Sequence, residues 1–315
     1  MNVLVTGGAG FIGSNLADEL IRQGAKVRII DNFLTGYQEN LDDIKGDFDF
    51  YKADINDSAE LKKALKDVEV VFHQAALPSV PRSVVNPLET HNVCVNGTFN
   101  VLANAKEAGV RRVIYAASSS AYGDQELSPK VETMRPEPLS PYAVAKLVGE
   151  YYAQVFYRAY GLETICLRYF NVFGPRQDPT SQYSGVISRF VDSLSKGERP
   201  IIFGDGEQTR DFTFVANVVN ANIKASQTSK GIGEVINTAN GEAISLNNLL
   251  NVLKGLLERH DVEAIYEAPR NGDIIDSLAD NSKAKECFGY EKLIGLEDGL
   301  SKTIDWWKQS RFSKI

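Results

Sequence analysis

Short apolar runs and longer amphipathic runs follow one another through the first half of the chain. Helical periodicity is present at 14–22, 58–66, 88–108 and 141–160. Runs typical of strands lie between these segments, at 3–5, 27–31, 48–51, 70–72, 112–117 and 164–168. Strands that alternate with helices pack into a parallel sheet that is covered on both faces. The pattern therefore predicts an α/β fold with a doubly wound parallel (Rossmann) sheet.

This alternation ends after about residue 171, where two Pro-containing turns mark loops. Helices are predicted beyond them near 184–196, 216–228, 245–258 and 295–309, with a short strand at 200–203. A further strand at 234–237 is expected to return to the main sheet. We therefore predict a Rossmann domain over residues 1–170, with a returning segment at about 211–238. Residues 171–210 and 239–310 are predicted to form a smaller C-terminal α/β domain.

Composition and charge narrow the range of partners. The 315 residues carry a net charge of −7, and no basic stripe is present, which argues against nucleic acid or an anionic membrane as a partner. No apolar run is long enough to span a bilayer, and none has the form of a secretory signal. Widely spaced cysteines predict reduced thiols in a cytoplasmic protein. The histidines make no metal-binding spacing with the cysteines: His73, His91, His260, Cys94, Cys166 and Cys287.

The N-terminal strand runs directly into a glycine-rich turn and a helix. The spacing Gly8-x-Gly10-x-x-Gly13, preceded by Gly7, fits the dinucleotide-binding fingerprint. The early glycines let a pyrophosphate approach the backbone, and the last lets the helix pack closely on the strand. The helix start offers free N–H groups to the phosphates. Asp31 ends the second strand, and its carboxylate suits a ribose with two free hydroxyls, so the loop predicts NAD rather than NADP.

Further candidate cofactor-binding residues follow the third and fourth strands. Ligands of an open α/β sheet bind beyond the carboxyl ends of its strands. Asp54 and Ile55 follow the third strand, where we expect them to flank the adenine. Ala75 and Ala76 follow the fourth strand, where small side chains let the phosphate–ribose portion of the cofactor lie close. We expect His73, at the end of that strand, to be structural rather than catalytic.

The fifth strand ends in Ser118, and a helix is predicted downstream, with Ser140 as N-cap. Tyr142 and Lys146 lie four residues apart on one face of this helix. Free tyrosine titrates near about 10, so a tyrosine base needs a nearby ammonium group and the positive nicotinamide ring to favour its phenolate. Ser118 can hydrogen-bond the reacting oxygen and relay its proton. The alternative is a pair of surface residues on an amphipathic helix, but the dinucleotide loop and the serine-ended strand favour catalysis.

Several longer segments match one known family nearly from end to end. They are TGGAGFIG, HQAALPSVPRS, ASSSAYGD, SPYAVAK, RYFNVFGP, the turn at 176–179, FGDGEQTRDF and RNGD. The chain resembles the extended short-chain dehydrogenases/reductases and, within them, the UDP-sugar 4-epimerases. The resemblance is closest to the UDP-N-acetylglucosamine/UDP-N-acetylgalactosamine 4-epimerases of bacterial polysaccharide pathways. It implies that Tyr142 is the base, Lys146 its partner and a ribose ligand, and Ser118 the family's Ser/Thr hydroxyl.

The resemblance also implies NAD as cofactor and a UDP-sugar as substrate. The predicted cofactor-binding residues are Gly7, Gly10, Phe11, Ile12, Gly13, Asp31, Asn32, Asp54, Ile55, Ala75, Ala76, Asn92, Tyr142, Lys146 and Tyr169. The predicted substrate-binding residues are Ser79, Ser118, Ser119, Ser120, Tyr142, Asn171, Val186, Ile201, Phe203, Arg210, Arg270, Asp273 and Ser277. Asn171, Arg210 and Arg270 would hold the diphosphate. Asp273 would hold the uridine ribose, with Ile201 and Phe203 beside the uracil.

The reaction implied is epimerisation at C4 through a 4-keto intermediate. Ser119 and Ser120 stand where related 4,6-dehydratases carry an Asp-Glu pair, so elimination lacks its acid. Ser277 stands where the family has a residue bordering the 2-substituent of the sugar, and a small serine leaves room for an N-acetyl group. We therefore predict turnover of UDP-GlcNAc/UDP-GalNAc, together with UDP-Glc/UDP-Gal.

Two alternatives stay open at this point. One is another NAD-dependent UDP-sugar modifier, either a dehydratase or a UDP-glucuronate 4-epimerase. The latter needs a basic residue for the sugar carboxylate, which 181–186 does not supply but Arg176 could. The other is a non-catalytic NAD-binding scaffold that keeps the fold. The resemblance further implies a homodimer through a four-helix bundle of the helices at 88–108 and 141–160, although burial of their apolar faces on the sheet would give the same pattern.

Overall fold

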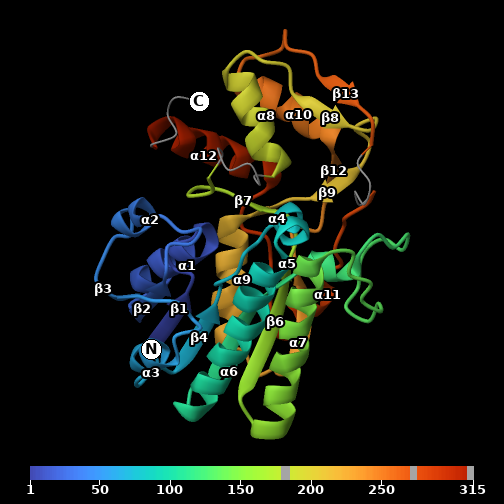
Figure 1. Ribbon diagram of the computed structural model, residues 1–315. Coiled ribbons are helices and arrows are strands. Elements are labelled where there is room, and N and C mark those ends of the chain that lie inside the picture. The colour runs from blue at the N-terminus through green and yellow to red at the C-terminus, as the bar shows by residue number, and fades with distance from the viewer. Residues whose placement is uncertain (179–184, 270–274, 311–315) are drawn as a thin grey trace.

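The computed structural model describes residues 1–178, 185–269 and 275–310. A sheet flanked by helices forms the lower part of the molecule in Figure 1, and a smaller group of helices and short strands lies above it. This arrangement confirms the predicted α/β class. The exact division into two domains stays a prediction.

The central sheet has seven strands, all paired in parallel, in the order β3-β2-β1-β4-β5-β6-β11. The strands are β1 (Asn2–Thr6), β2 (Lys26–Asp31), β3 (Phe48–Lys52), β4 (Val70–His73), β5 (Arg112–Ser118), β6 (Glu163–Tyr169) and β11 (Glu234–Thr238). The strand order reverses between β1 and β4, the place where ligands bind in sheets of this kind. The pairing of β11 with β6 confirms that the segment near 234 returns to the main sheet.

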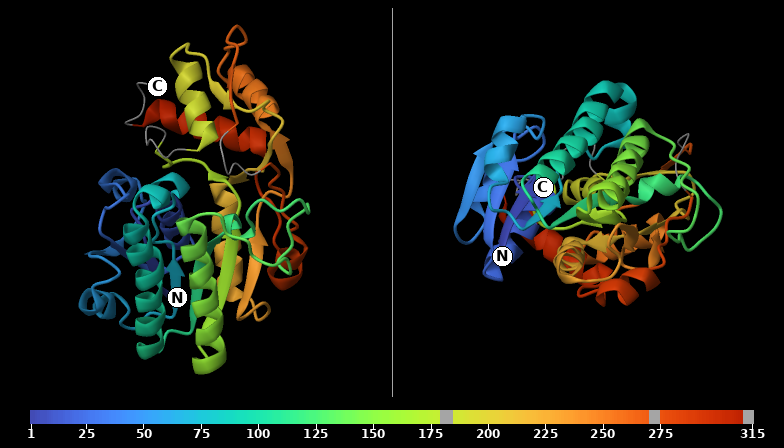
Figure 2. Two further views of the ribbon diagram at one scale, coloured as in Figure 1. Left: turned by 45° about the vertical axis from the view of Figure 1, so that its right-hand side comes forward. Right: turned by 90° about the horizontal axis from the view of Figure 1, so that it is seen from below.

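Alternate residues of the strands enter two separate cores. Val3 and Val5 pack with α1 and α9, whereas Leu4 packs with α3, α6 and α7. The two groups of helices lie on opposite faces of the sheet, as the view from below in Figure 2 shows. The helices of this part are α1 (Phe11–Arg22), α2 (Gln38–Asp42), α3 (Ser58–Ala64), α4 (Val80–Val85), α5 (Pro87–His91), α6 (Gly97–Glu107), α7 (Pro141–Tyr160), α9 (Val215–Gln227) and α11 (Ser282–Phe288).

The single helix predicted at 88–108 needs a correction. It consists of α5, a π-helical segment at Asn92–Asn96, and α6. The π turn fits one extra residue where the helix crosses the carboxyl edge of the sheet, a place where such turns often accompany function. At Gly97 the helix lies so close to the loop after β3 that a Cβ would be 2.5 Å from Ile55 Cδ1. Tertiary contact rather than local periodicity accounts for this segment.

The smaller part contains α8 (Val186–Ser195), α10 (Leu246–Leu256) and α12 (Leu296–Gln309), whose apolar faces pack together. Three pairs of short strands accompany them: β7 (Val172–Phe173) with β10 (Thr213–Phe214), β8 (Ile201–Phe203) with β13 (Ile265–Glu267), and β9 (Thr209–Asp211) with β12 (Ala243–Ser245). Within the described ranges, no helix combines the length and the apolar character that crossing a membrane requires.

Candidate functional site

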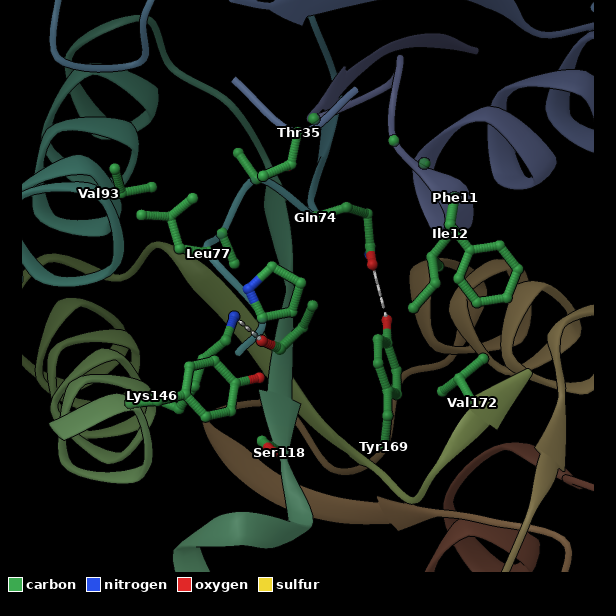
Figure 3. A pocket seen from close by; sticks show the side chains of 18 of the residues that line it. Phe11, Ile12, Thr35, Gln74, Leu77, Val93, Ser118, Lys146, Tyr169 and Val172 are labelled. Carbon is green, nitrogen blue, oxygen red and sulfur yellow. Dashed lines mark hydrogen bonds between the residues drawn. The ribbon is translucent and has the colours of Figure 1, made fainter. Parts of the chain in front are cut away.

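A cavity of about 570 Å³ lies at the carboxyl edge of the main sheet, between the sheet and the smaller part. Figure 3 shows side chains around it from α1, the π segment, β5, α7, β6, β7 and the loops after β2 and β4. The predicted residues that line it are Gly7, Gly10, Phe11, Ile12, Gly13, Asp31, Asn32, Asp54, Ile55, Ala75, Ala76, Ser118, Ser119, Ser120, Tyr142, Lys146, Tyr169, Asn171, Arg210 and Ser277. The fold thus brings most of the predicted site together.

The glycine loop after β1 forms one wall of the cavity. A Cβ on Gly13 would lie 2.2 Å from the Gly7 carbonyl oxygen, so this residue allows the helix to pack against the turn. Gly7 has φ +69°, and a Cβ there would meet the Ala75 backbone at 2.7 Å. Gly10 lines the cavity as the N-cap of α1, where a Cβ would approach only the Gly7 oxygen, at 3.2 Å. The free N–H groups of α1 therefore face open space, as a pyrophosphate requires.

Two carboxylates stand at the far end of this wall. Asp31 is buried, and its oxygens accept hydrogen bonds from the backbone N–H groups of Ala9 (3.0 Å) and Phe33 (2.7 Å). Burial raises the pKa of Asp31, although these N–H groups oppose the shift. Asn32 Nδ2 donates to Asp54 Oδ2 at 2.8 Å. The backbone thus holds Asp31 at the cavity edge, in position to accept from ribose hydroxyls.

His73 has the structural role expected of it. It is fully buried between Thr6 and Thr98, with Nδ1 2.7 Å from Thr6 Oγ1 and Nε2 3.0 Å from Thr98 Oγ1. Thr98 donates its hydroxyl hydrogen to the Cys94 carbonyl, so it accepts from Nε2–H of His73, and Nδ1 accepts from Thr6. Burial, aided by the charge of Lys146, lowers the pKa of His73 to about 3. A neutral imidazole therefore links β1 and β4 to α6.

The predicted catalytic residues meet where β5 ends against α7. Ser140 Oγ accepts from Ala143 N–H at 3.1 Å, which confirms the predicted cap and helix start. Lys146 is buried, with Nζ donating to the Ala116 carbonyl at 2.8 Å (Figure 3). Ser118 Oγ accepts from Ser120 Oγ at 2.9 Å. Ser118 and Lys146 are therefore held in place by contacts with other residues of the same chain.

Burial acts against the charged form of both α7 residues. It raises the pKa of Tyr142, and a hydrogen bond with Ser118 lowers it in part. Burial lowers the pKa of Lys146, and negative charge at Cys94 and Glu150 opposes the shift. The protein alone therefore does not produce the acidic phenol expected from the sequence. A positive charge brought by a ligand is needed to favour the phenolate.

The substrate side of the cavity is formed by three distant segments. Asn171 Nδ2 donates to the Asp211 carbonyl at 3.0 Å and lies 3.5 Å from Ser277 Oγ. The buried carboxylate of Asp211 accepts N–H bonds from residues 240, 241 and 279, at 2.9–3.2 Å. Burial raises the pKa of Asp211 to about 7 despite these bonds. Asp211 thus joins the segments that carry Asn171, Arg210 and Ser277.

Five predicted residues do not line the cavity. Asn92 is exposed in the π segment, Ser79 caps α4, and Val186 begins α8. Ile201 and Phe203 lie on β8, on the face opposite the buried Ile202. Arg270 and Asp273 lie outside the described residues.

Other lining residues were not predicted, and one of them has buried partners. Gln74 Nε2 lies 3.1 Å from the hydroxyl of Tyr169, and Asn222 Nδ2 donates to the same hydroxyl at 2.8 Å. Figure 3 shows Gln74 and Tyr169 meeting across the cavity floor. The position of Gln74 directly after a buried strand was the available signal. The remaining unpredicted lining residues include Leu34, Thr35, Leu77, Pro78, Val80, Val93, Val172, Gln177 and Gly185.

Comparison with known proteins agrees with this geometry. Residues 3–239 match the model of the NAD dependent epimerase/dehydratase family. A putative UDP-glucose 4-epimerase of Methanocaldococcus jannaschii is 41% identical over 98% of this chain and 99% of its own length.

Two solved structures are similar over nearly their whole length. One is a UDP-N-acetylglucosamine 4-epimerase from Methanobrevibacter ruminantium in complex with UDP-N-acetylmuramic acid, with a TM-score of 0.93, 40% identity and coverage of 100% of this chain and 99% of that chain. The other is a UDP-glucose 4-epimerase from Thermotoga maritima with UDP-glucose, with a TM-score of 0.92, 40% identity and coverage of 98% and 99%. With the fingerprint loop, Asp31 and the Ser118–Tyr142–Lys146 group all on one cavity, the chain belongs to the NAD dependent epimerase/dehydratase family and uses NAD as its cofactor.

Proposed function

We propose that this protein inverts C4 of UDP-GlcNAc/UDP-GalNAc and also accepts UDP-Glc/UDP-Gal. The observation that carries the proposal is the position of Ser277. Its small side chain lines the cavity, with Oγ 3.5 Å from Asn171 Nδ2. A bulky residue at this place would fill the space next to the sugar, whereas serine leaves room for an N-acetyl group.

The acids of the cavity argue against elimination. Among the described lining residues the carboxylates are Asp31 and Asp54, which follow β2 and β3 at the cofactor end. Ser119 and Ser120 line the cavity directly after β5, and the hydroxyl of Ser120 is bonded to Ser118. A dehydratase needs a proton donor near C5 and C6 of the sugar. No carboxylic acid is available there in the described part of the wall.

The contacts of Arg176 argue against a uronate substrate. Its guanidinium donates to the Ser14 carbonyl at 2.8 Å, to Asp18 Oδ2 at 3.1 Å and to the Asp43 carbonyl at 3.0 Å. These partners lie on α1 and just after α2, and Arg176 is absent from the described cavity lining. The cations of that lining are Lys146 and Arg210. Lys146 is bonded to the β5 backbone at the Ala116 carbonyl, and Arg210 donates to the Thr209 carbonyl at 2.7 Å; of these two cations we assign Arg210 to the diphosphate.

NAD fits the first wall of the cavity. Gly7, Gly10 and Gly13 would hold the pyrophosphate at the start of α1, and Asp31 would hold the adenine ribose. When bound, NAD⁺ supplies an acceptor for hydride from C4 and a donor that returns it. The remaining steps fall to the protein.

Tyr142 takes the proton of the sugar 4-hydroxyl and later returns it to the same oxygen, after the 4-keto sugar has turned its opposite face toward the cofactor wall. Ser118 lies within hydrogen-bonding reach of Tyr142 and can relay this proton. Lys146, fixed by the Ala116 carbonyl, presents a positive charge one helical turn from Tyr142 and favours its phenolate. General acid–base transfer of this kind contributes about 10²–10⁴-fold to a rate.

Inversion requires the 4-keto sugar to turn while its diphosphate stays in place. Arg210 and Asn171 would anchor the diphosphate, since charge-assisted hydrogen bonds are the strongest available for an anion. Arg270 and Asp273, predicted for the diphosphate and the uridine ribose, lie outside the described residues. The roles of Ile201 and Phe203 at the uracil also stay predictions.

A product assay tests the proposed activity. The purified protein, loaded with NAD⁺, is incubated separately with UDP-GlcNAc, UDP-Glc and UDP-GlcA, and the products are separated by chromatography. We expect UDP-GalNAc and UDP-Gal, with no product from UDP-GlcA. Ser277→Tyr should lose UDP-GlcNAc turnover and keep UDP-Glc turnover, whereas Ser277→Ala should keep both. Full turnover of UDP-GlcNAc by Ser277→Tyr would refute the space argument.

We also propose a homodimer through α6 and α7. The apolar residues Phe99, Tyr152 and Val155 are exposed on these helices, and the rings of Phe99 and Tyr152 lie 5.3 Å apart. By contrast, Val101, Leu102 and Phe156 are buried in the core beneath the helices and do not form this face. Light scattering should give twice the monomer mass. Val155→Glu should give a monomer and the control Leu293→Glu a dimer, while a monomeric wild type would contradict the proposal.

A further inference from the structure

A buried ion pair lies directly behind the catalytic helix. Glu150 of α7 and Arg168 of β6 form two hydrogen bonds, Nε to Oε1 at 2.9 Å and an amino nitrogen to Oε2 at 2.7 Å. The side chains are only 1% and 3% exposed. A buried pair of this kind often contributes little net stability, because removing two charges from water offsets most of their attraction. Its presence beside an active site therefore suggests an electrostatic purpose.

Lys146 is a group whose charged form a nearby carboxylate could stabilise. Its ammonium must stay charged to favour the phenolate of Tyr142, yet it is only 3% exposed and donates a hydrogen bond to the neutral Ala116 carbonyl at 2.8 Å. The ring of Tyr115 adds a cation–π contact at 5.0 Å. Glu150 lies one turn further along α7, four residues from Lys146 and on the same face. It is the one carboxylate among the described groups that act on Lys146.

Other titratable groups surround this site, and Cys94 opposes the lowering of the pKa of Lys146 together with Glu150. They are His73 of β4, Cys94 of the π segment, Tyr115 of β5, Tyr122 after β5, Tyr142 of α7 and Cys166 of β6. Burial keeps the imidazole neutral by lowering its pKa, and it raises the pKa of the Tyr115, Tyr122 and Cys166 groups. None of these four therefore supplies a negative charge near neutral pH.

We propose that Glu150, held by Arg168, is a positioning residue that keeps Lys146 protonated for proton transfer. Arg168 is itself anchored, with its guanidinium 4.5 Å from the centre of the Tyr122 ring. The Tyr122 hydroxyl donates to Asn237 Oδ1 at 2.7 Å. Arg168 of β6 thus holds the carboxylate, and Tyr122, in the segment after β5, packs against Arg168. The catalytic consequence rests on the proposed function, whereas the effect on Lys146 does not.

Variants that change the charge of the ion pair are expected to affect the pKa of Lys146 differently. Glu150→Gln removes the negative charge and leaves Arg168 unbalanced, so the pKa of Lys146 should fall by about one unit, as expected for one charge at the distance of a helical turn. Arg168→Met removes the competing cation, so Glu150 acts on Lys146 alone. The pKa of Lys146 should therefore stay the same or rise. In Glu150→Gln/Arg168→Met the carboxylate is absent but no cation is left unbalanced, so the pKa of Lys146 should still fall, by less than in Glu150→Gln.

The direct measurement is an NMR titration of isotope-labelled lysine side chains in the full-length protein. The signal of Lys146 is identified by its loss in Lys146→Met. The second measurement is the alkaline limb of the kcat/KM profile, with whichever UDP-sugar is converted. We expect this limb to shift to lower pH by about one unit in Glu150→Gln, by less in the double variant, and not in Arg168→Met.

The outcomes separate this proposal from a merely structural role. A structural pair would lower the melting temperature of all three variants and leave the pKa of Lys146 unchanged. An unchanged pKa in Glu150→Gln, or a fall of equal size in Arg168→Met, would overturn the proposal. If Glu150→Gln does not fold, the double variant and Arg168→Met still give the comparison, and an unchanged pKa of Lys146 in the double variant or a clear fall in Arg168→Met decides against the proposal. A failure of the UDP-sugar assays would leave the NMR result valid.

Discussion

The two walls of the cavity are built in different ways. The cofactor wall comes from short contiguous segments, each placed directly after a strand of one sheet: the glycine loop, Asp31, Asp54 and the pair Ala75–Ala76. The substrate wall comes from Asn171, Arg210 and Ser277, which belong to segments separated by tens of residues. The first wall needs only that the sheet forms. The second depends on bonds between segments, such as those to the carboxylate of Asp211.

This difference means that changes to the two walls should produce different defects. Damage to the cofactor wall should affect stability and NAD binding together, because the same backbone contacts serve both. Damage to the substrate wall should raise KM for the UDP-sugar and leave NAD in place. Tyr142 and Ser118 stand where the walls meet, so changes there should affect kcat alone.

The largest effect is expected at this junction. Tyr142→Phe removes the group that carries the proton, and kcat should fall by about 10³-fold, within the range for general acid–base catalysis. NAD content and melting temperature should be unchanged. Tyr151→Phe, on the exposed side of the same helix, is the matched control and should keep full activity. A decrease of less than tenfold in Tyr142→Phe would assign the proton transfer to another group.

The next effect tests the cofactor wall. Gly13→Ala places a Cβ 2.2 Å from the Gly7 carbonyl oxygen, which forces the loop and helix apart. We expect a loss of about 1–3 kcal/mol in the free energy of unfolding, the usual cost of overpacking, with loss of bound NAD. Urea denaturation and the absorbance of released cofactor measure both.

Gly255→Ala is the control for that change. Gly255 lies in α10, where an added Cβ would have no neighbour within 4 Å, so alanine should stabilise the helix by up to about 1 kcal/mol. A stable Gly13→Ala protein that retains NAD would show that the loop tolerates a side chain. The packing account of the cofactor wall would then be wrong.

The substrate wall should respond through binding. Arg210→Met removes the guanidinium proposed to hold the diphosphate, and hydrogen bonds to charged groups contribute about 1.5–3 kcal/mol each. The KM for UDP-GlcNAc should rise by about 10–100-fold, with a smaller change in kcat. NAD retention should match the wild type. Lys196→Met, a surface change in the same part of the molecule, should leave KM unchanged, and an equal rise there would point to a general effect of charge.

The smallest effect is a pH dependence within the cofactor wall. The pKa of buried His73 is lowered to about 3 from an unfolded value of 6.5, so the unfolded state binds the extra proton between these values. Stability from the neutral imidazole is complete above pH 6.5 and is lost as pH falls toward 3. At pH 5 the loss is about 2 kcal/mol.

Urea denaturation from pH 7 to pH 4 measures this loss. His73→Gln should be less stable at pH 7 but should show a flatter dependence on pH. His260→Gln, at an exposed site, should follow the wild-type curve. An equally steep curve in His73→Gln would place the titrating group elsewhere.

Local sequence patterns were sufficient to predict features whose geometry depends on a single contiguous segment. The strand–glycine–helix order of 3–22 predicted the loop, and Ser140 with Pro141 predicted the start of α7 and hence the shared face of Tyr142 and Lys146. The same reasoning failed at 92–96, because the π turn depends on contacts with distant parts of the molecule. Helical periodicity in the sequence does not encode such contacts. The short helices α2, α4 and α11 were also not predicted.

The sequence alone determined the α/β class and the cofactor loop, and it named the candidate catalytic group, because contiguous residues set backbone conformation and strand ends converge on one edge of a parallel sheet. Only the tertiary structure decided that Arg176 is bound to the α1 region, that Gln74 meets Tyr169, and that Glu150 pairs with Arg168 behind Lys146. Each of those depends on side chains from distant segments. Packing and desolvation determine which distant side chains pair, and no single stretch of sequence carries that information.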